Sequence, residues 1–96
     1  MSTAAAKRHM GRVADLGCIA CEILARGSVP SEIHHVREGR VARNDWLVLP
    51  LCSPHHRQSS EYSIHLAKPA LMRALGVLSE FDLLAIVLEH LGGPKR

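Results

Sequence analysis

The chain has 96 residues, a formal net charge of +3, seven histidines and three cysteines. This length suits one domain, and a domain so small buries only about 60% of the surface of its unfolded chain, so a metal or a partner often supplements its core. An odd number of cysteines excludes complete disulfide pairing within one chain, and no apolar run approaches the ~20 residues of a membrane span. We therefore expect a soluble, intracellular protein without a membrane partner, whose mildly basic balance permits a polyanionic one.

The first half of the chain predicts an arm followed by two short strands. Residues 1–16 are small, polar and basic with little apolar surface, which predicts an N-terminal arm or a frayed helix. Residues 31–36 and 46–51 have apolar side chains in strand-like patterns, and we expect these two segments to pair antiparallel. Residues 37–45 form the long polar connection between them, and loops of this kind often carry function.

Short helices are expected after the second strand. Ser53 is placed to cap a helix that has Pro54 in its first turn, where a missing N–H costs little. Another helix is expected over residues 68–75, ending near Gly76 because glycine readily takes the left-handed conformation that ends helices.

The last helix has clear start and stop signals. Ser79 is a typical N-cap, and Glu80 and Asp82 in the first turn favour the positive end of the helix dipole. The helix is expected to end at the Gly-Gly-Pro sequence of residues 92–94. Its apolar residues share one face, which predicts core or, as the minority interpretation, a dimer interface: Phe81, Leu84, Val87, Leu88 and Leu91.

Two matched pairs of ligand residues predict a zinc site. Cys18 and Cys21 form a Cys-x-x-Cys pair, and Cys52 and His55 repeat the same spacing after thirty intervening residues. Tetrahedral zinc accepts three thiolates and one imidazole, and such a closed site is structural. The alternative is three buried, inert thiols and a surface histidine. A thiol redox role is disfavoured because the chain lacks the βαβ context that such a motif needs.

Four other histidines lie where they can share a second centre. His34 and His35 are adjacent on the first expected strand, so they point to opposite faces and reach one centre only at a strand end or a bulge. Two such imidazoles can divide the roles of metal ligand and base. His56 follows the expected zinc ligand and can face this pair, and a turn near residues 59–60 would return His65 to the same place.

Three residues are expected to have no role in chemistry. His9 has no evident partner and is expected to be solvated. His90 lies near the end of the last helix, where a cation suits the dipole. Trp46 is expected in the core because a chain with so few aromatic residues needs them there.

Four arginines flank the expected histidine centre. They are candidates for holding phosphate groups by charge-assisted hydrogen bonds, and the equally weighted alternative is a solvated basic surface. These residues are Arg37, Arg40, Arg43 and Arg57.

The ordered set of motifs resembles the HNH family of nucleases, also called the ββα-metal or His-Me finger family. The resemblance covers roughly residues 18–65. It is carried by Cys18-x-x-Cys21, Ile33-His34-His35, Asn44 and Leu51-Cys52-Ser53-Pro54-His55-His56. The trailing Ile64-His65 followed by a helix is most similar to the phage recombination-enhancement, or Ref-like, branch.

The resemblance implies an α+β fold. A small ββα-metal core with a structural zinc knuckle would occupy about residues 17–66, and C-terminal helices would follow over about residues 67–92. Together they would form one HNH nuclease domain over residues 17–96.

The resemblance also implies a division of roles in the site. His35 would be the general base, and the amide of Asn44 would pin the loop and orient it. His34 would bind a catalytic divalent cation such as Mg²⁺ or Mn²⁺, with His56, the last histidine of the catalytic motif, as the second ligand. His65 would complete the metal shell. The sequence departs from the family pattern by placing His55 where a fourth cysteine is usual and Arg57 where a lysine is usual.

The expected activity is metal-dependent hydrolysis of DNA phosphodiester bonds with low intrinsic sequence specificity. The alternative is a non-catalytic, zinc-stapled nucleic-acid-binding module. The expected setting is the cytoplasm of a prokaryotic cell, with a phage or prophage origin. The chain is expected to be a monomer or a weak homodimer through its last helix, with a further protein supplying its targeting.

Overall fold

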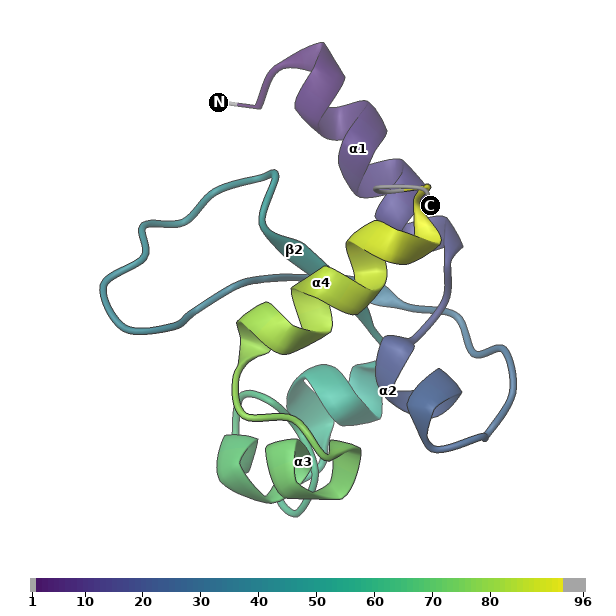
Figure 1. Cartoon of the computed structure of the whole chain (residues 1–96), viewed down its shortest axis with the longest axis vertical. Coiled ribbons are helices and arrows are strands. Elements are labelled where there is room, and N and C mark those ends of the chain that lie inside the picture. The colour runs from purple at the N-terminus through teal and green to yellow at the C-terminus, as the bar shows by residue number, and fades with distance from the viewer. Residues whose placement is uncertain (1, 93–96) are drawn as a thin grey trace.

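The computed structural model describes residues 2–92 and has a small α+β fold (Figure 1). Its elements in chain order are α1 Ala4–Asp15, α2 Ile19–Ile23, β1 Glu32–His35, β2 Val48–Leu51, the π-helix η1 Pro54–Gln58, α3 Lys68–Leu75 and α4 Glu80–His90. Two strands, flanking helices and a cluster of three cysteines and one histidine confirm the predicted fold class.

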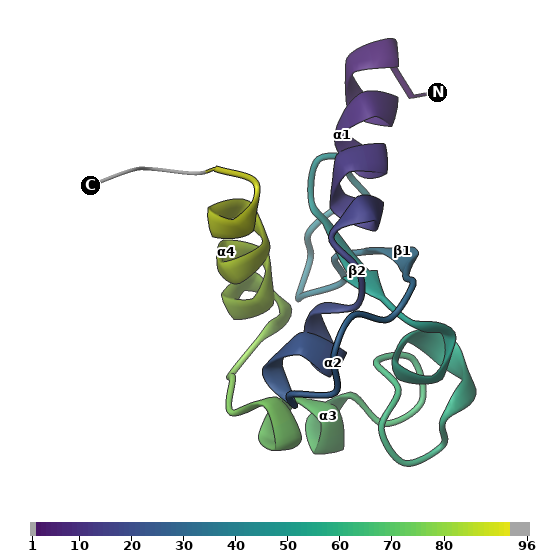
Figure 2. The ribbon, with the colours of Figure 1, turned by 90° about the vertical axis from the view of Figure 1, so that its right-hand side faces the viewer.

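The two strands form one antiparallel pair. Glu32 lies opposite Leu51, and His35 lies opposite Val48. Every residue of β2 is buried, because α1, α2 and α4 all pack against this strand. Figure 2 shows α1 rising from the strands and α4 running beside them. The antiparallel pairing predicted from the sequence is therefore confirmed, with strands somewhat shorter than expected.

Helix α1 packs one side against the strands. Thr3 caps it by accepting a hydrogen bond from the Ala6 N–H, and its buried side includes His9. The His9 ring stacks on Trp46, with centroids 4.8 Å apart, and donates its Nε2–H to the Trp46 carbonyl at 3.2 Å. The expectations of a solvated His9 and a core Trp46 are both wrong, since His9 is 7% exposed and Trp46 is 48% exposed. The imidazole takes the inner position because it has a buried acceptor there, and the indole covers it from outside.

Helix α3 matches the sequence prediction at both ends. It runs from Lys68 to Leu75, with Pro69 in its first turn. Gly76 follows in the left-handed conformation, with φ 72°. A residue with a Cβ is strained at this φ, so the glycine is what allows the helix to end here.

Helix α4 begins as predicted but buries a different side. Ser79 and Asp82 form a capping box, as the start signal indicated. Leu84 and Val87 are buried as expected, whereas Phe81 and Leu88 of the predicted stripe are about 40% exposed. Their places in the interior are taken by Leu83 and by the carboxylate side chain of Glu80, which is 1% exposed. This rotation brings the Glu80 carboxylate to the partners that are described below.

One apolar core joins the four α-helices to the strands. Its fully buried members come from α1, α2, β2, α3 and α4: Val13, Ala20, Val48, Leu49, Leu51, Leu71, Leu83 and Val87. Two residues predicted to end α4, Gly93 and Pro94, lie outside the described residues. Within residues 2–92, none of the helices combines the length and apolar character that crossing a bilayer requires.

Candidate functional site: two histidine-containing clusters

Three cysteines and one histidine converge at the junction of α2, β2 and η1. Cys18 is the N-cap residue of α2, and Cys21 lies within that helix. Cys52 directly follows β2, and His55 is the second residue of η1. All four side chains are buried. The structure therefore brings together the four ligands that the two Cys-x-x-(Cys/His) pairs predicted.

The spacing of these four side chains fits a tetrahedral zinc ion. The Sγ atoms of Cys21 and Cys52 are 3.8 Å apart. The His55 Nδ1 lies 3.7 Å from the Cys18 Sγ, 3.6 Å from the Cys21 Sγ and 3.2 Å from the Cys52 Sγ. Zinc with Zn–S distances of about 2.3 Å and Zn–N distances of about 2.0–2.1 Å places its sulfurs about 3.8 Å apart and sulfur and nitrogen about 3.6 Å apart. The cluster can bind zinc with little rearrangement.

Burial sets the protonation of these groups. Desolvation and the neighbouring Cys18 raise the pKa of Cys21 to about 12, and desolvation raises the pKa of Cys52. Desolvation and the positive charge of Arg26 lower the pKa of His55, so its imidazole is neutral, as a ligand must be. Metal binding must therefore displace thiol protons, which couples the ion to the folding of this region.

A second cluster contains three imidazoles from separate segments. His34 lies in β1, His56 in η1, and His65 in the segment before α3. Each offers one nitrogen, and the three nitrogens lie within 4.8 Å of one another. The ring centroids of His34 are 5.3 Å from those of both His56 and His65. The cluster opens to solvent on one side, since His34 is buried, His56 is half-buried and His65 is exposed.

A tight return of the chain places His65 in this cluster. The π-helix ends at Gln58. The Ser59 hydroxyl then accepts hydrogen bonds from the backbone N–H groups of Glu61 and Tyr62. The chain then runs back along η1, where the His65 N–H donates to the His56 carbonyl at 3.2 Å. The Ile64 N–H likewise donates to the His55 carbonyl at 2.7 Å. The turn expected near residues 59–60 therefore exists.

The helix expected from Ser53 onward is a single π-helical turn. The Ser53 side chain makes no cap hydrogen bond and instead donates to the Glu32 Oε2 at 2.6 Å. This hydrogen bond connects the start of η1 to β1. Consecutive residues His55 and His56 then serve the two different clusters.

His35 is not a member of the three-imidazole cluster and pairs with a carboxylate. Its Nε2–H donates to the Asp45 Oδ1 at 2.7 Å, and the Ser2 hydroxyl also donates to Asp45. These hydrogen bonds, the Ser2 one first, hold the pKa of Asp45 below its usual value. Asn44 has a different partner: its Oδ1 accepts from the Trp46 N–H at 2.8 Å. The contact that orients His35 thus comes from Asp45, and Asn44 holds the turn of the loop.

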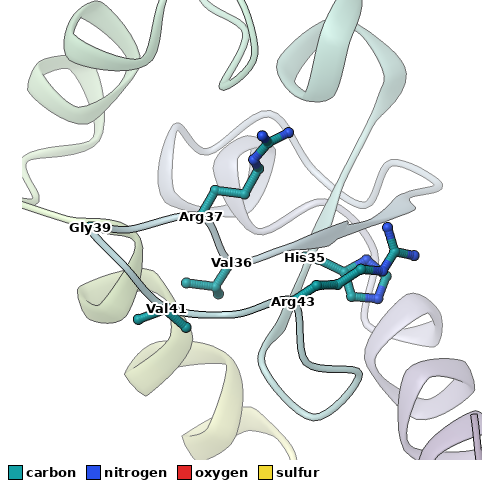
Figure 3. A pocket seen from close by; sticks show the side chains of 6 residues that line it. All are labelled: His35, Val36, Arg37, Gly39, Val41 and Arg43. Carbon is teal, nitrogen blue, oxygen red and sulfur yellow. The ribbon is translucent and has the colours of Figure 1, made fainter.

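Two neighbouring cavities meet at His35. One has a volume of about 570 Å³ and is lined by the β1 end and the following loop, as Figure 3 shows: His35, Val36, Arg37, Gly39, Val41 and Arg43. The other, of about 400 Å³, is lined by both histidine groups and their neighbours: Ser2, Met10, Ile33, His34, His35, Arg37, Arg43, Asp45, His56 and His65. Arg43 extends beside His35 in Figure 3. The base candidate and the three-imidazole cluster therefore open into the same space.

The four arginines predicted to flank the site differ in their surroundings. Arg37 and Arg43 line both cavities and have exposed side chains. Arg40 is exposed but lines neither cavity. Arg57 forms a two-point hydrogen-bonded ion pair with Glu32, with N–O distances of 3.0 and 2.9 Å. Its charge is partly neutralised there.

Three carboxylates in the site were not singled out from the sequence. Asp45 contacts His35, Glu32 contacts His56, and Glu80 contacts His34. Glu32 lies two residues before His34, so it shares a strand face with it, which is a signal that could have been used. Glu80 was assigned only to the dipole of α4.

The comparison with known families agrees with this arrangement. A family model described as recombination enhancement, RecA-dependent nuclease matches residues 2–84. No curated protein matches the sequence. The matched range covers well over half of the 96 residues and contains both clusters, the His35–Asp45 pair and Glu80. The chain therefore belongs to the family of recombination enhancement, RecA-dependent nucleases.

Proposed function

We propose that the chain is a metal-dependent endonuclease of the HNH type that hydrolyses DNA phosphodiester bonds, with the Cys₃His cluster as its structural zinc site. The observation that carries this proposal is the shared cavity: His35, held by Asp45, opens into the same space as His34, His56 and His65. Membership of a nuclease family supports the reaction class.

The donor set of the second cluster suits a catalytic cation. Three imidazoles on one side leave the remaining positions of a divalent ion open to water and phosphate oxygens. Desolvation and the neighbouring His34 and His56 lower the pKa of His65, so its imidazole is neutral and can bind an ion. Mg²⁺, Mn²⁺ or another divalent ion held here would neutralise charge on the scissile phosphate and on the leaving oxygen.

His35 is proposed as the general base. Its Nε2–H donates to Asp45, which leaves the Nδ1 lone pair to take a proton from a water molecule. The water oxygen attacks phosphorus, the P–O bond to the leaving oxygen breaks, and that oxygen gains a proton from solvent. The Asp45 carboxylate stabilises the imidazolium that His35 becomes, as well as fixing its orientation.

Arg37 and Arg43 are proposed to hold the phosphates beside the cleaved bond, since both line the cavities that meet at His35. Arg40 is proposed to contact DNA further along the loop. Arg57 contributes less because Glu32 pairs with it. Guanidinium groups contact phosphates without reading bases, so this arrangement agrees with low sequence specificity. The description of the family as RecA-dependent makes RecA the protein to include in the test.

The test is cleavage of supercoiled plasmid by the zinc-loaded protein with Mg²⁺ or Mn²⁺, in the absence and presence of RecA bound to single-stranded DNA. The variants are His35→Ala and, as a matched control, His90→Ala, whose ring pairs with Glu22 away from the site. Cleavage by the wild type and the control, with none by His35→Ala, is expected.

Equal cleavage by the wild type and His35→Ala would contradict the role of His35. No metal-dependent cleavage in either condition would contradict the nuclease itself. Retained DNA binding in that case would favour the alternative, a non-catalytic, zinc-stapled nucleic-acid-binding module.

A further inference from the structure

Glu80 is a buried carboxylate at the first position of α4, far from β1 in the sequence. Its side chain is 1% exposed. The histidine that it contacts, His34, lies 46 residues earlier in the chain. The His34 Nε2–H donates to the Glu80 Oε1 at 2.8 Å, and the same oxygen accepts the Arg37 N–H at 3.0 Å. Burying a carboxylate costs free energy unless it is paired and hydrogen-bonded, so these contacts must be specific.

Lys68 completes the surroundings of this carboxylate. Its ammonium group lies 2.7 Å from the Glu80 Oε2 and 3.1 Å from the Glu38 Oε2, and it donates to the Arg37 carbonyl at 2.8 Å. Glu38 in turn accepts the Glu80 N–H at 2.6 Å. The ion pair with Lys68 and the hydrogen bonds from His34 and the Arg37 N–H hold this carboxylate as a fixed anion beside His34.

Glu32 contacts His56 in the same way as Glu80 contacts His34. The His56 Nδ1–H donates to the Glu32 Oε1 at 2.8 Å. Ser53 and Arg57 occupy the other positions of this carboxylate, so it too has a fixed orientation. The hydrogen bond from Arg57, followed by those of Ser53 and His56, holds the pKa of Glu32 well below its usual range.

Each carboxylate determines which ring nitrogen carries the proton. An ionised carboxylate only accepts hydrogen bonds, so the contacted nitrogen must be the donor and the other nitrogen keeps its lone pair. In His34 the free nitrogen is Nδ1, and in His56 it is Nε2. Among residues 2–92 no hydrogen bond is made by the His65 ring, so its tautomer is not fixed in this way.

We infer that Glu80 and Glu32 are positioning residues that hold His34 and His56 in the tautomers and orientations needed to bind one divalent cation. The inference rests on the proposed function and deepens it, because it makes α4, which lies outside the expected ββα core, part of the cation site. Histidine ligands in metalloproteins commonly donate their second nitrogen to a carboxylate, and loss of that partner typically costs about 10–100-fold in metal affinity.

The variant Glu80→Gln tests this role. A glutamine amide can donate its own N–H to the His34 Nε2, which would move the ring proton to Nδ1 and block the nitrogen whose lone pair is otherwise left to bind a cation. Glu89→Gln is the matched control, since it makes the same chemical change at an exposed position of α4. A double variant, Lys68→Met with Glu80→Gln, removes both charges of the ion pair, so it leaves no unpaired ammonium.

Two measurements read out the effect without cleavage. Both use protein loaded with one equivalent of zinc, so that the ion fills the Cys₃His cluster and leaves the three imidazoles for Mn²⁺. The first is the tautomer of His34, from ¹⁵N chemical shifts of its ring. The second is Mn²⁺ affinity by calorimetry, since Mn²⁺ lies low in the Irving–Williams order and does not displace zinc from thiolates. Zinc content and the near-ultraviolet circular dichroism spectrum identify variants that remain folded. We expect wild type and Glu89→Gln to bind alike with the proton on Nε2, and Glu80→Gln and the double variant to bind about 10–100-fold more weakly. Glu32→Gln is expected to weaken binding to the same extent.

Unchanged Mn²⁺ affinity and an unchanged His34 tautomer in folded Glu80→Gln would overturn the inference while leaving the nuclease proposal intact. A wild-type protein whose Mn²⁺ binding is insensitive to His34→Ala would overturn the cation site itself, and both proposals with it.

Discussion

Removing the Cys₃His zinc ion should unfold the domain rather than only loosen it. A domain of 96 residues has a free energy of unfolding of about 5–14 kcal/mol at the usual 0.05–0.15 kcal/mol per residue. Structural zinc bound by such ligands contributes about 10–16 kcal/mol at neutral pH. The contribution of the ion is therefore as large as the whole stability of the domain. The four ligands are buried and link α2, β2 and η1, so loss of the ion would disconnect three elements at once.

The assay is thermal unfolding followed by circular dichroism, in reducing buffer, before and after treatment with EDTA. The variant Cys52→Ala should behave like the EDTA-treated wild type, with no cooperative transition. His65→Ala is the control because it removes a ligand of the second cluster only, and it should unfold cooperatively when zinc is present. An EDTA-treated protein that is free of zinc yet keeps the native spectrum and melting temperature would refute the reasoning.

Two further predictions concern the core and the paired base. Leu83→Ala should lower the free energy of unfolding of the zinc-loaded protein by about 2–5 kcal/mol in urea titrations, since Leu83 is fully buried. Leu78→Ala, at a position 95% exposed, should change it by no more than about 0.5 kcal/mol, and equal losses would contradict the assigned core. The Ser2 and His35 hydrogen bonds lower the pKa of Asp45, so the native state binds fewer protons than the unfolded state. The stabilisation that ionised Asp45 contributes is present above its unfolded-state pKa of about 3.9. It is lost as the pH falls through the folded-state pKa of Asp45. The free energy of unfolding of Asp45→Asn should therefore fall less than that of the wild type between about pH 5 and pH 3. Parallel curves of this free energy against pH for the two proteins would contradict the prediction.

The parts of the site that could be predicted from the sequence are those set by short-range spacing. Cys18 and Cys21, like Cys52 and His55, are separated by two residues, and one turn of chain suffices to bring each pair to one ion. Gly76 and Ser79 likewise act on the helix ends next to them. These signals are local, so tertiary packing had little room to override them.

The residues that could not be predicted depend on competition between neighbours or on long-range packing. Asn44 and Asp45 are chemically similar, and the resemblance favoured Asn44 as the partner of His35. In the loop, Asn44 bonds the backbone two residues on, as such side chains commonly do, and this leaves Asp45 to reach the imidazole. The Glu80–His34 contact joins residues 46 apart, and it follows from how α4 packs on β2. No local pattern encodes that rotation of the helix.

The three-imidazole cluster depends on the Cys₃His cluster, but the reverse does not hold. The dependence arises because both clusters include a residue of η1. His55 binds in the Cys₃His cluster while the next residue, His56, belongs to the three-imidazole cluster. The carbonyl groups of these same two residues accept the N–H groups of Ile64 and His65, which is how the returning segment delivers the third imidazole. Without the zinc site, η1 has five residues and no side-chain cap, and the contacts of Ser53, His56 and Arg57 that tie it to β1 all go to the single side chain of Glu32. Loss of zinc should therefore remove both His56 and His65 from the second site. Loss of a cation from the second cluster would leave every predicted zinc ligand in place. We therefore predict that zinc binding precedes formation of the proposed cation site.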